Sequence, residues 1–309
     1  MRMSRRAVAI VAGIAVLAGA GVVVAMARHG HDSPRRAAPT TTTVTAPTST
    51  TVAASTTTLV IATTTTTQVI ATTTTTVTTA PPPPTAGSLG ALRGKIIAID
   101  PGHDGGNYAH AGDIARPIFI GTETRACDTT GTETDDGYTE AEYTLDVALR
   151  LRDLLQAAGA RVVMTRTTND GWGPCIDERA AIGNRAGADA AISIHADGGP
   201  AGGRGFHVLM PGLVPGYTDD IYSASHRLGV DVRDAFLATG MPTSTYYATD
   251  GLVERTDLGG LNLSNVPKVF IETGNMRNAT DAALLESADF RERAAVELAA
   301  GLDTFLAGG

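Results

Sequence analysis

The sequence predicts an α/β fold: a single domain over residues 89–309, with a central, mostly parallel sheet flanked by helices on both faces. Three short runs of β-branched and small apolar residues, 96–100, 190–194 and 269–271, are typical of buried strands. Helical patterns alternate with such strands along the chain, as in parallel sheets joined by crossover helices. About 220 residues are enough to enclose one sizeable core.

The expected elements follow from these patterns in chain order. After the first strand, residues 104–138 are rich in Gly, Thr and Asp, which predicts a long loop. In the helix expected at 140–158, Val147, Leu151 and Leu155 share one face, and Gly159 is placed to end it. The remaining elements are strand 161–165, helix 176–186, strand 190–194, strand 205–210, helix 222–237, strand 268–272 and helices 281–287 and 290–306.

Residues 1–36 predict a segment that exports the domain. Three arginines lie within residues 1–6, and residues 7–27 are all apolar or glycine, close to the roughly 20 residues that a membrane span needs. The triplet Ala25-Met26-Ala27 resembles a signal-peptide cleavage site, although Arg28 follows it directly. An uncleaved membrane anchor and a cleaved signal peptide both stay open. In either case we expect the domain in the cell envelope, in the periplasmic space or outside the cell.

Residues 37–88 predict a disordered linker. They are rich in Thr and Pro and contain no charged residue. Large apolar side chains are too few to offset the entropy of ordering this stretch. A composition of this kind also fits an O-glycosylated stalk. We expect a spacer, with no function of its own.

The domain is more acidic than the chain as a whole. Six of the 24 Lys and Arg residues and one of the 32 Asp and Glu residues precede residue 37, and residues 37–88 have none. The domain therefore carries 18 basic and 31 acidic residues, a net charge of −13 against −8 for the whole chain. This charge argues against binding to nucleic acid or to anionic membrane surfaces.

The chain has two cysteines, Cys127 and Cys175, both in irregular segments rich in Gly, Thr or Pro. In an exported protein this count favours a single disulfide between them. We expect neither cysteine to ligate zinc or to act as a nucleophile.

Three side chains suited to metal binding or proton transfer follow the predicted strands: His103, His195 and Glu272. Ligands of open α/β sheets bind beyond the carboxyl ends of the strands, so these side chains should lie close together. Catalytic zinc takes three protein ligands and leaves one position for water. The sequence therefore predicts a zinc hydrolase. We expect inert or structural roles for the five other histidines, which are His29, His31, His110, His207 and His226.

The third zinc ligand should be a carboxylate at the start of the helix that begins near residue 140. Thr139 and Glu142 have the spacing of a capping box, which assigns Glu142 to the backbone. Glu140 is then free either to ligate the metal or merely to favour the helix dipole, and the residues alone leave these two alternatives open. For Glu272 we expect the role of general base and acid, because burial raises the pKa of a carboxylate towards the useful range.

The domain resembles the zinc-dependent N-acetylmuramoyl-L-alanine amidases of the amidase-3 family, most closely those of the mycobacterial type. The matching pieces occur in the order of the family and span residues 95–309. Each piece is weakly specific by itself, whereas the ordered set is highly specific. The pieces are Asp100-Pro101-Gly102-His103, Glu140, Thr165-Arg166, Arg179 with Asn184, Ser193-Ile194-His195-Ala196-Asp197 and Ile271-Glu272-Thr273-Gly274-Asn275.

This resemblance implies that His103, Glu140 and His195 ligate one Zn²⁺ and that Glu272 is the catalytic glutamate. It implies hydrolysis of the amide between N-acetylmuramic acid and L-alanine in peptidoglycan or muropeptides, for wall remodelling and daughter-cell separation. Cys127 and Cys175 also match the disulfide pair of the mycobacterial type. Arg166, Arg179 and Asn184 are expected to be structural, and the protein to be a monomer.

Some positions depart from the family pattern. Ala141 follows the ligand glutamate where a basic residue is frequent, Asp197 stands where many members have asparagine, and the loop 104–138 is long. These departures affect the expected substrate preference and access to the site. Two alternatives remain: a zinc peptidase that cuts the stem peptide, and a wall-binding homologue without catalysis. The presence of all four catalytic and ligand residues argues against the second.

Overall fold

The computed structural model describes residues 89–248 and 250–308. The predicted export segment 1–36 and the linker 37–88 lie outside the described residues, so both stay predictions. Within the described part, no helix is both long enough and apolar enough to cross a membrane.

The centre of the domain is a mixed, mostly parallel sheet of six strands in the order β4-β1-β5-β8-β6-β7. β6 runs antiparallel to β8, and the other neighbouring pairs are parallel. β1 and β5 are buried along nearly their whole length, which explains their continuous apolar runs. The strand bounds are β1 Ile96–Pro101, β4 Arg161–Met164, β5 Ala190–Asp197, β6 His207–Pro211, β7 Leu252–Arg255 and β8 Lys268–Asn275.

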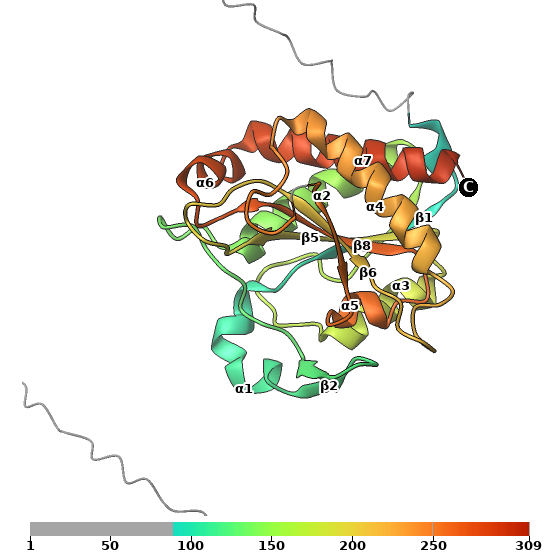
Figure 1. Ribbon diagram of the computed structural model, residues 1–309, viewed down its shortest axis with the longest axis horizontal. Helices are drawn as coiled ribbons and strands as arrows, with labels where there is room; N and C mark the ends of the chain where they lie inside the picture. The colour runs from blue at the N-terminus through green and yellow to red at the C-terminus, as the bar shows by residue number, and fades with distance from the viewer. Residues whose placement is uncertain (1–88, 249, 309) are drawn as a thin grey trace, which may run out of the picture. The chain divides into compact units, whose positions relative to one another are not determined.

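Helices cover both faces of this sheet, as the sequence predicted (Figure 1). α2, α4 and α7 pack on one face, and α3 with the short α5 packs on the other. The helix bounds are α1 Ala111–Ile114, α2 Glu140–Ala157, α3 Ile176–Ala186, α4 Tyr222–Phe236, α5 Gly259–Asn262, α6 Ala279–Leu285 and α7 Ala288–Ala307. Short 3-10 turns lie at Gly90–Leu92, Gly105–His110 and Leu237–Thr239.

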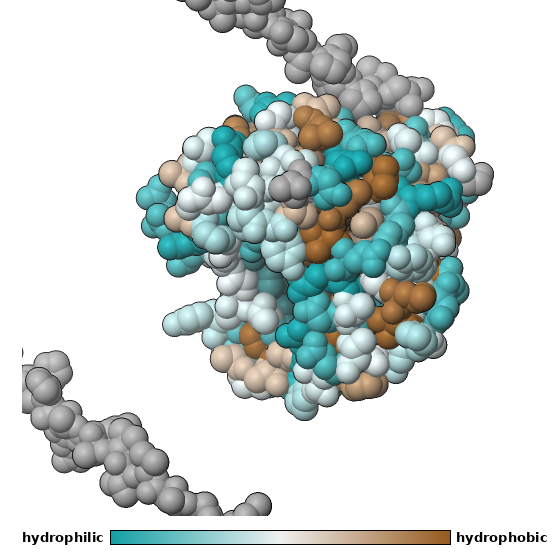
Figure 2. Space-filling view, in the orientation of Figure 1, coloured by the Kyte–Doolittle hydropathy of each residue, from teal (hydrophilic) through white to brown (hydrophobic). Residues whose placement is uncertain are grey.

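The two faces of the sheet differ in how they pack. The larger hydrophobic core lies under α2, α4 and α7 and includes the fully buried Tyr143, Leu151 and Phe290. Under α3 the contact is made by small residues: a Cβ on Gly183 would lie 3.3 Å from the Cβ of Ala98. On the outer face drawn in Figure 2, hydrophobic residues form patches that hydrophilic residues separate.

The structure corrects several expected boundaries. β5 and β8 continue past their apolar runs to Asp197 and Asn275, because the two strands stay paired through a bulge after His195. His195 and Glu272 thus lie within their strands, and only His103 follows one. α6 begins at Ala279 because Asn278 caps it, accepting bonds from the amides of Thr280 and Asp281.

The segment 104–138 is not the plain loop that its composition predicts. It contains a 3-10 turn, α1 and a small hairpin of β2 Pro117–Phe119 and β3 Thr124–Ala126. β7 and α5 were also not expected. These elements are three or four residues long apart from the turn, and most of the hairpin is exposed, so they show no hydrophobic period that the sequence could reveal.

Candidate metal centre and active site

Two histidines and one glutamate meet at the carboxyl ends of β1 and β5. His103 Nε2 lies 3.2 Å from Glu140 Oε2, and His195 Nδ1 lies 2.9 Å from Glu140 Oε1. One ligand atom from each residue lies within 4.8 Å of the other two. Two imidazoles with one carboxylate are a donor set of catalytic zinc sites. The three residues therefore fit one metal ion.

The parallel pairing of β1 with β5 brings the two histidines together. Pro101 of β1 is in register with Ile194 of β5, next to His195, and the amide of Gly102 donates to the Ile194 carbonyl at 3.0 Å. A Cβ on Gly102 would overlap the imidazole ring of His195. Glycine at this position is thus needed for the ring of His195 to lie against the end of β1.

Helix capping places Glu140. Thr139 and Glu142 form the predicted capping box, so Glu142 faces the backbone and Glu140, in the first turn, faces the histidines. The buried Glu140 carboxylate also accepts the amide of Ala196 at 3.2 Å and that of Thr132 at 3.0 Å. Burial alone would raise the pKa of Glu140, but His103 and His195 outweigh it and hold that pKa well below its usual range. Glu140 is therefore ionised.

The remaining ring nitrogen of His103 faces away from the cluster. His103 Nδ1 donates to the carbonyl of Thr129 at 3.0 Å and lies 3.4 Å from Asp128 Oδ1. This contact keeps the proton on Nδ1 and directs Nε2 at Glu140. Burial lowers the pKa of His103, but Glu140 and Asp128 outweigh it and raise that pKa to about 10. A metal ion entering here would therefore compete with a proton.

Glu272 lies beside the cluster because β8 neighbours β5. Its Cα is in register with that of His195, and its side chain lines the same cavity, of about 360 Å³, as all three cluster residues. Glu272 Oε2 is buried and has no hydrogen-bond partner among the described residues. Burial is the main cause that raises the pKa of Glu272 well above its usual value, and repulsion from Glu140 and Asp197 raises it further. The carboxylate is thus suited to take up a proton.

The wall behind Glu272 is aromatic. His207 pairs with Glu272 across β6 and β8, and its buried ring stacks on Tyr247 with ring centroids 5.0 Å apart. Burial lowers the pKa of His207 to about 4, so the ring adds no positive charge near neutral pH. Tyr246 donates from its hydroxyl to Asp197 Oδ2 at 2.9 Å. Neither tyrosine was predicted from the sequence to belong to the site.

Two further hollows extend from the cluster. One, of about 340 Å³, includes Ile176, Phe270 and Arg125 beside the two histidines, and the ring of Phe270 stacks on that of His195. The other, of about 700 Å³, meets the cavity of Glu272 at Gly131, Thr132 and Gly198 and includes the exposed Tyr108 and Arg277. These hollows leave room beside the cluster for an extended substrate.

The three residues expected to be structural, Arg166, Arg179 and Asn184, all donate hydrogen bonds to backbone carbonyls of the protein. Arg166 Nη2 donates to the carbonyls of Gly102 and Ala141, which join the end of β1 to α2. Asn184 donates to the Leu263 carbonyl at 2.9 Å. Arg179 is buried and donates to the carbonyl of His103 at 2.9 Å.

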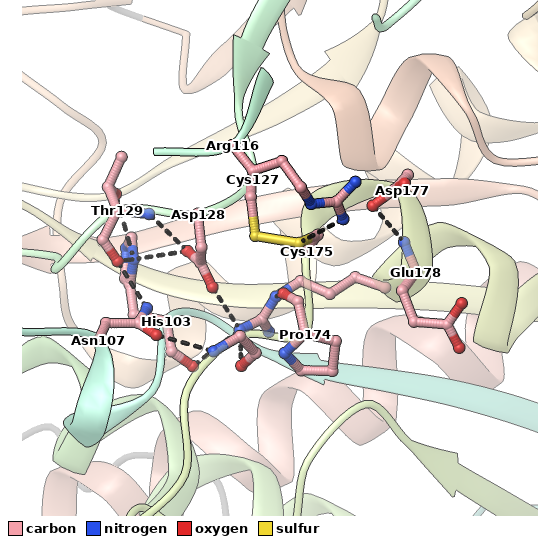
Figure 3. Close-up of a disulfide and its surroundings, with 12 residues drawn as sticks. His103, Asn107, Arg116, Cys127, Asp128, Thr129, Pro174, Cys175, Asp177 and Glu178 are labelled. Carbon is pink, nitrogen blue, oxygen red and sulfur yellow. Dashed lines mark hydrogen bonds and ion pairs between the residues drawn. A yellow bond between two sulfur atoms is a disulfide. The ribbon is translucent and has the colours of Figure 1, made fainter. Parts of the chain in front are cut away.

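The other described histidines lie outside the cluster. His110 stacks on Trp172 and pairs with Asp113 at 2.9 Å, and His226 donates to the Pro211 carbonyl at 3.0 Å. His29 and His31 lie outside the described residues. The two cysteines form the expected disulfide, Cys127–Cys175, which Figure 3 shows beside Asp128 and His103.

Sequence reasoning missed several residues of the site. A Cβ on Gly131, whose φ is +75°, would lie 2.9 Å from both Glu140 Oε2 and His103 Cδ2, so the loop can close over the cluster only with glycine there. Asp128 was missed although it directly follows Cys127, the one signal that pointed to this segment. Arg255, which lines the same cavity as Glu272, and Tyr246 come from a stretch without a hydrophobic pattern.

Comparisons with known proteins agree with this geometry. Residues 97–304 match the family model described as N-acetylmuramoyl-L-alanine amidase. The N-acetylmuramoyl-L-alanine amidase Rv3717 of Mycobacterium tuberculosis is 42% identical over 217 residues, 70% of this chain and 88% of that protein.

Two crystal structures are similar as well. The N-acetylmuramyl-L-alanine amidase Ami1 of Mycobacterium smegmatis is 41% identical with a TM-score of 0.66, and the match covers 71% of this chain and 99% of that one. The apo form of Ami1 from Mycobacterium abscessus is 41% identical with a TM-score of 0.65, covering 69% and 99%.

Proposed function

Since this chain belongs to the N-acetylmuramoyl-L-alanine amidase family and is thus a peptidoglycan hydrolase, we propose that it works with one zinc ion held by His103, Glu140 and His195. The bond cut is the amide between N-acetylmuramic acid and the L-alanine of the stem peptide. The observation that carries the proposal is the position of Glu272, which shares one cavity with all three proposed ligands.

The proposed ligands suit this ion by their chemistry. Two imidazole nitrogens and one carboxylate leave a position open, as catalytic zinc sites do. When bound, zinc supplies Lewis acidity, which polarises an amide carbonyl and makes water acidic near neutral pH. Glu140 contributes the negative charge of the ligand set, and its bonds from the amides of Thr132 and Ala196 hold it in place.

Glu272 acts first as general base and then as general acid. Its carboxylate removes a proton from the attacking water as the water oxygen bonds to the amide carbon. Glu272 then passes this proton to the nitrogen of L-alanine as the carbon–nitrogen bond breaks. The products are the lactyl carboxylate of N-acetylmuramic acid and a stem peptide with a free amino terminus. The raised pKa of Glu272 suits it to hold the proton between the two steps.

Product analysis tests this proposal. Purified peptidoglycan is digested with the protein, and the fragments are identified by mass spectrometry. We expect intact stem peptides with a free L-alanine amino group and glycan strands without peptides. Shortened stem peptides would instead identify a zinc peptidase. A chelator should stop the release of peptides, and added Zn²⁺ should restore it.

Export of the domain is part of the proposal, because peptidoglycan lies outside the cytoplasmic membrane. The apolar run 7–27 supports it, and so does the Cys127–Cys175 disulfide, since such bonds persist in oxidising compartments. Amino-terminal sequencing of the protein recovered from the envelope distinguishes a cleaved signal from a retained anchor. Recovery of the protein in the cytoplasm would contradict export.

A further inference from the structure

We propose that Asp128, held by Arg179 and by the Cys127–Cys175 disulfide, positions His103 for the metal ion, so that the disulfide is a working part of the metal centre. This inference rests on the proposed zinc site. It goes further in assigning roles to a carboxylate, an arginine and a disulfide that lie behind one ligand.

The backbone of His103 lies in the left-handed region. Its φ is +57°, and it is the one residue other than glycine with a positive φ in the described part of the chain. A side chain in this left-handed region costs energy, and the conformation persists only where the surroundings impose it. The ring that should ligate the metal is thus carried by a strained backbone, which needs contacts to hold it.

The ring of His103 is held by Asp128 and Thr129. His103 Nδ1 lies 3.0 Å from the Thr129 carbonyl and 3.4 Å from Asp128 Oδ1. Asp128 is buried, and its Oδ1 also accepts the amide of Thr129 at 2.7 Å, which fixes the turn that presents the carbonyl. Partners of this kind orient ligating histidines, and their loss weakens metal affinity by about 10–100-fold.

Arg179 holds both Asp128 and the backbone of His103. Its Nη2 donates to Asp128 Oδ2 at 2.9 Å and to the carbonyl of His103 at 2.9 Å. The same nitrogen donates to the Gly173 carbonyl at 2.8 Å. The buried Arg179 guanidinium therefore links the Asp128 carboxylate to the strained backbone of His103. The same carboxylate faces the ring of His103.

The disulfide joins the two segments that carry these charges. Cys127 directly precedes Asp128, and Cys175 caps α3, one turn before Arg179. The amide of Ile176 donates to the Cys127 carbonyl at 2.8 Å, and that of Arg179 to the Cys175 carbonyl at 2.9 Å. In Figure 3, Asp128 lies between the sulfur bridge and His103. The bridge links residues 48 apart in sequence.

The experiment compares zinc affinities, measured by competition with a chromogenic chelator, for the exported domain with its disulfide intact. We expect Asp128→Asn to weaken zinc binding about 10-fold or more. The matched control is Asp113→Asn, which removes a carboxylate from His110 on a neighbouring segment and should leave zinc affinity unchanged. The d–d spectrum of the Co²⁺-loaded protein should shift in Asp128→Asn alone.

The disulfide is tested by Cys127→Ala with Cys175→Ala, alone and combined with Asp128→Asn. We expect the double cysteine variant to bind zinc more weakly than the wild type. In that background, Asp128→Asn should weaken zinc binding by a smaller factor than in the wild type, because both changes release the ring of His103. Fully additive effects would overturn the role of the disulfide.

The outcomes separate this inference from the proposed function. If the wild type binds zinc and Asp128→Asn binds it equally tightly, the inference fails and the zinc site stands. If Asp128→Asn lowers only the melting temperature of the metal-free protein, the role of Asp128 is structural and the inference fails too. If the wild type itself binds no zinc, both proposals fall.

Discussion

Glu272 on β8 lies directly opposite His195 on β5, in register between two neighbouring parallel strands. The proposed base and one proposed ligand are thus held by the same hydrogen-bonded ladder. A one-residue slip would turn either side chain to the other face of the sheet. The proposed proton transfer therefore depends on the register of the two central strands of the sheet.

Glu272→Gln tests the role of this carboxylate. We expect hydrolysis of muropeptides to fall by about 10²–10⁴-fold, because an amide of the same shape cannot take up the proton. Zinc content, measured by atomic absorption, should equal that of the wild type, since Glu272 is not a proposed ligand. Retained turnover in this variant would remove Glu272 from the mechanism.

His195→Ala tests the ligand set. Loss of one of three protein ligands should leave the purified protein without stoichiometric zinc, as measured by the same absorption assay. His226→Ala is the matched control, because His226 is half-buried in α4 and contacts the Pro211 carbonyl outside the cluster. Near-stoichiometric zinc in His195→Ala would refute this ligand assignment.

Gly102→Ala tests the packing of the centre. The added methyl group would overlap the His195 ring, so the ring or the end of β1 must shift. We expect weaker zinc binding and a destabilisation of about 1–3 kcal/mol, as for other overpacked sites. Gly112→Ala is the control, because a Cβ there meets no atom within 4 Å. The idea fails if zinc affinity and thermal unfolding of Gly102→Ala match the wild type.

Asp100→Asn tests the charge cluster beneath the site. Asp100 is buried and pairs with Lys268 Nζ and Arg179 Nη1, each at 2.9 Å. Removing this carboxylate takes from the buried Lys268 its ion-pair partner and leaves Arg179 paired with Asp128 alone, which costs about 3–5 kcal/mol of unfolding free energy. Chemical denaturation at pH 7 measures the loss. Exposed Asp153→Asn should change stability by less than about 0.5 kcal/mol.

The same aspartate predicts a pH dependence. Burial would raise the pKa of Asp100, but Lys268 and Arg179 outweigh it and hold that pKa well below the ordinary value of 3.8. A lowered folded-state pKa stabilises the protein above pH 3.8, and this stabilisation is lost as the pH falls towards the folded-state value. The stability gap between wild type and Asp100→Asn should therefore narrow below about pH 4. A gap that stays constant down to pH 2 would contradict this assignment.

The sequence by itself determined the class of the fold and most of the candidate site. Continuous apolar runs identified β1, β5 and β8, because buried parallel strands need apolar residues on both faces. The capping box of Thr139 and Glu142 is a local hydrogen-bond pattern, so it could be predicted from spacing alone and was confirmed. The pairing of the two cysteines followed from their number and from the predicted export of the domain.

Only the tertiary structure decided which side chains meet. The residues alone left open whether Glu140 was a ligand or served the helix dipole, because the answer depends on where α2 begins relative to β1 and β5. Asp128, Gly131 and Tyr246 come from irregular segments that reach the site through long-range loop closure. Local patterns of apolar residues and helix caps predict where each helix or strand forms. Contacts between these elements depend instead on strand order and register.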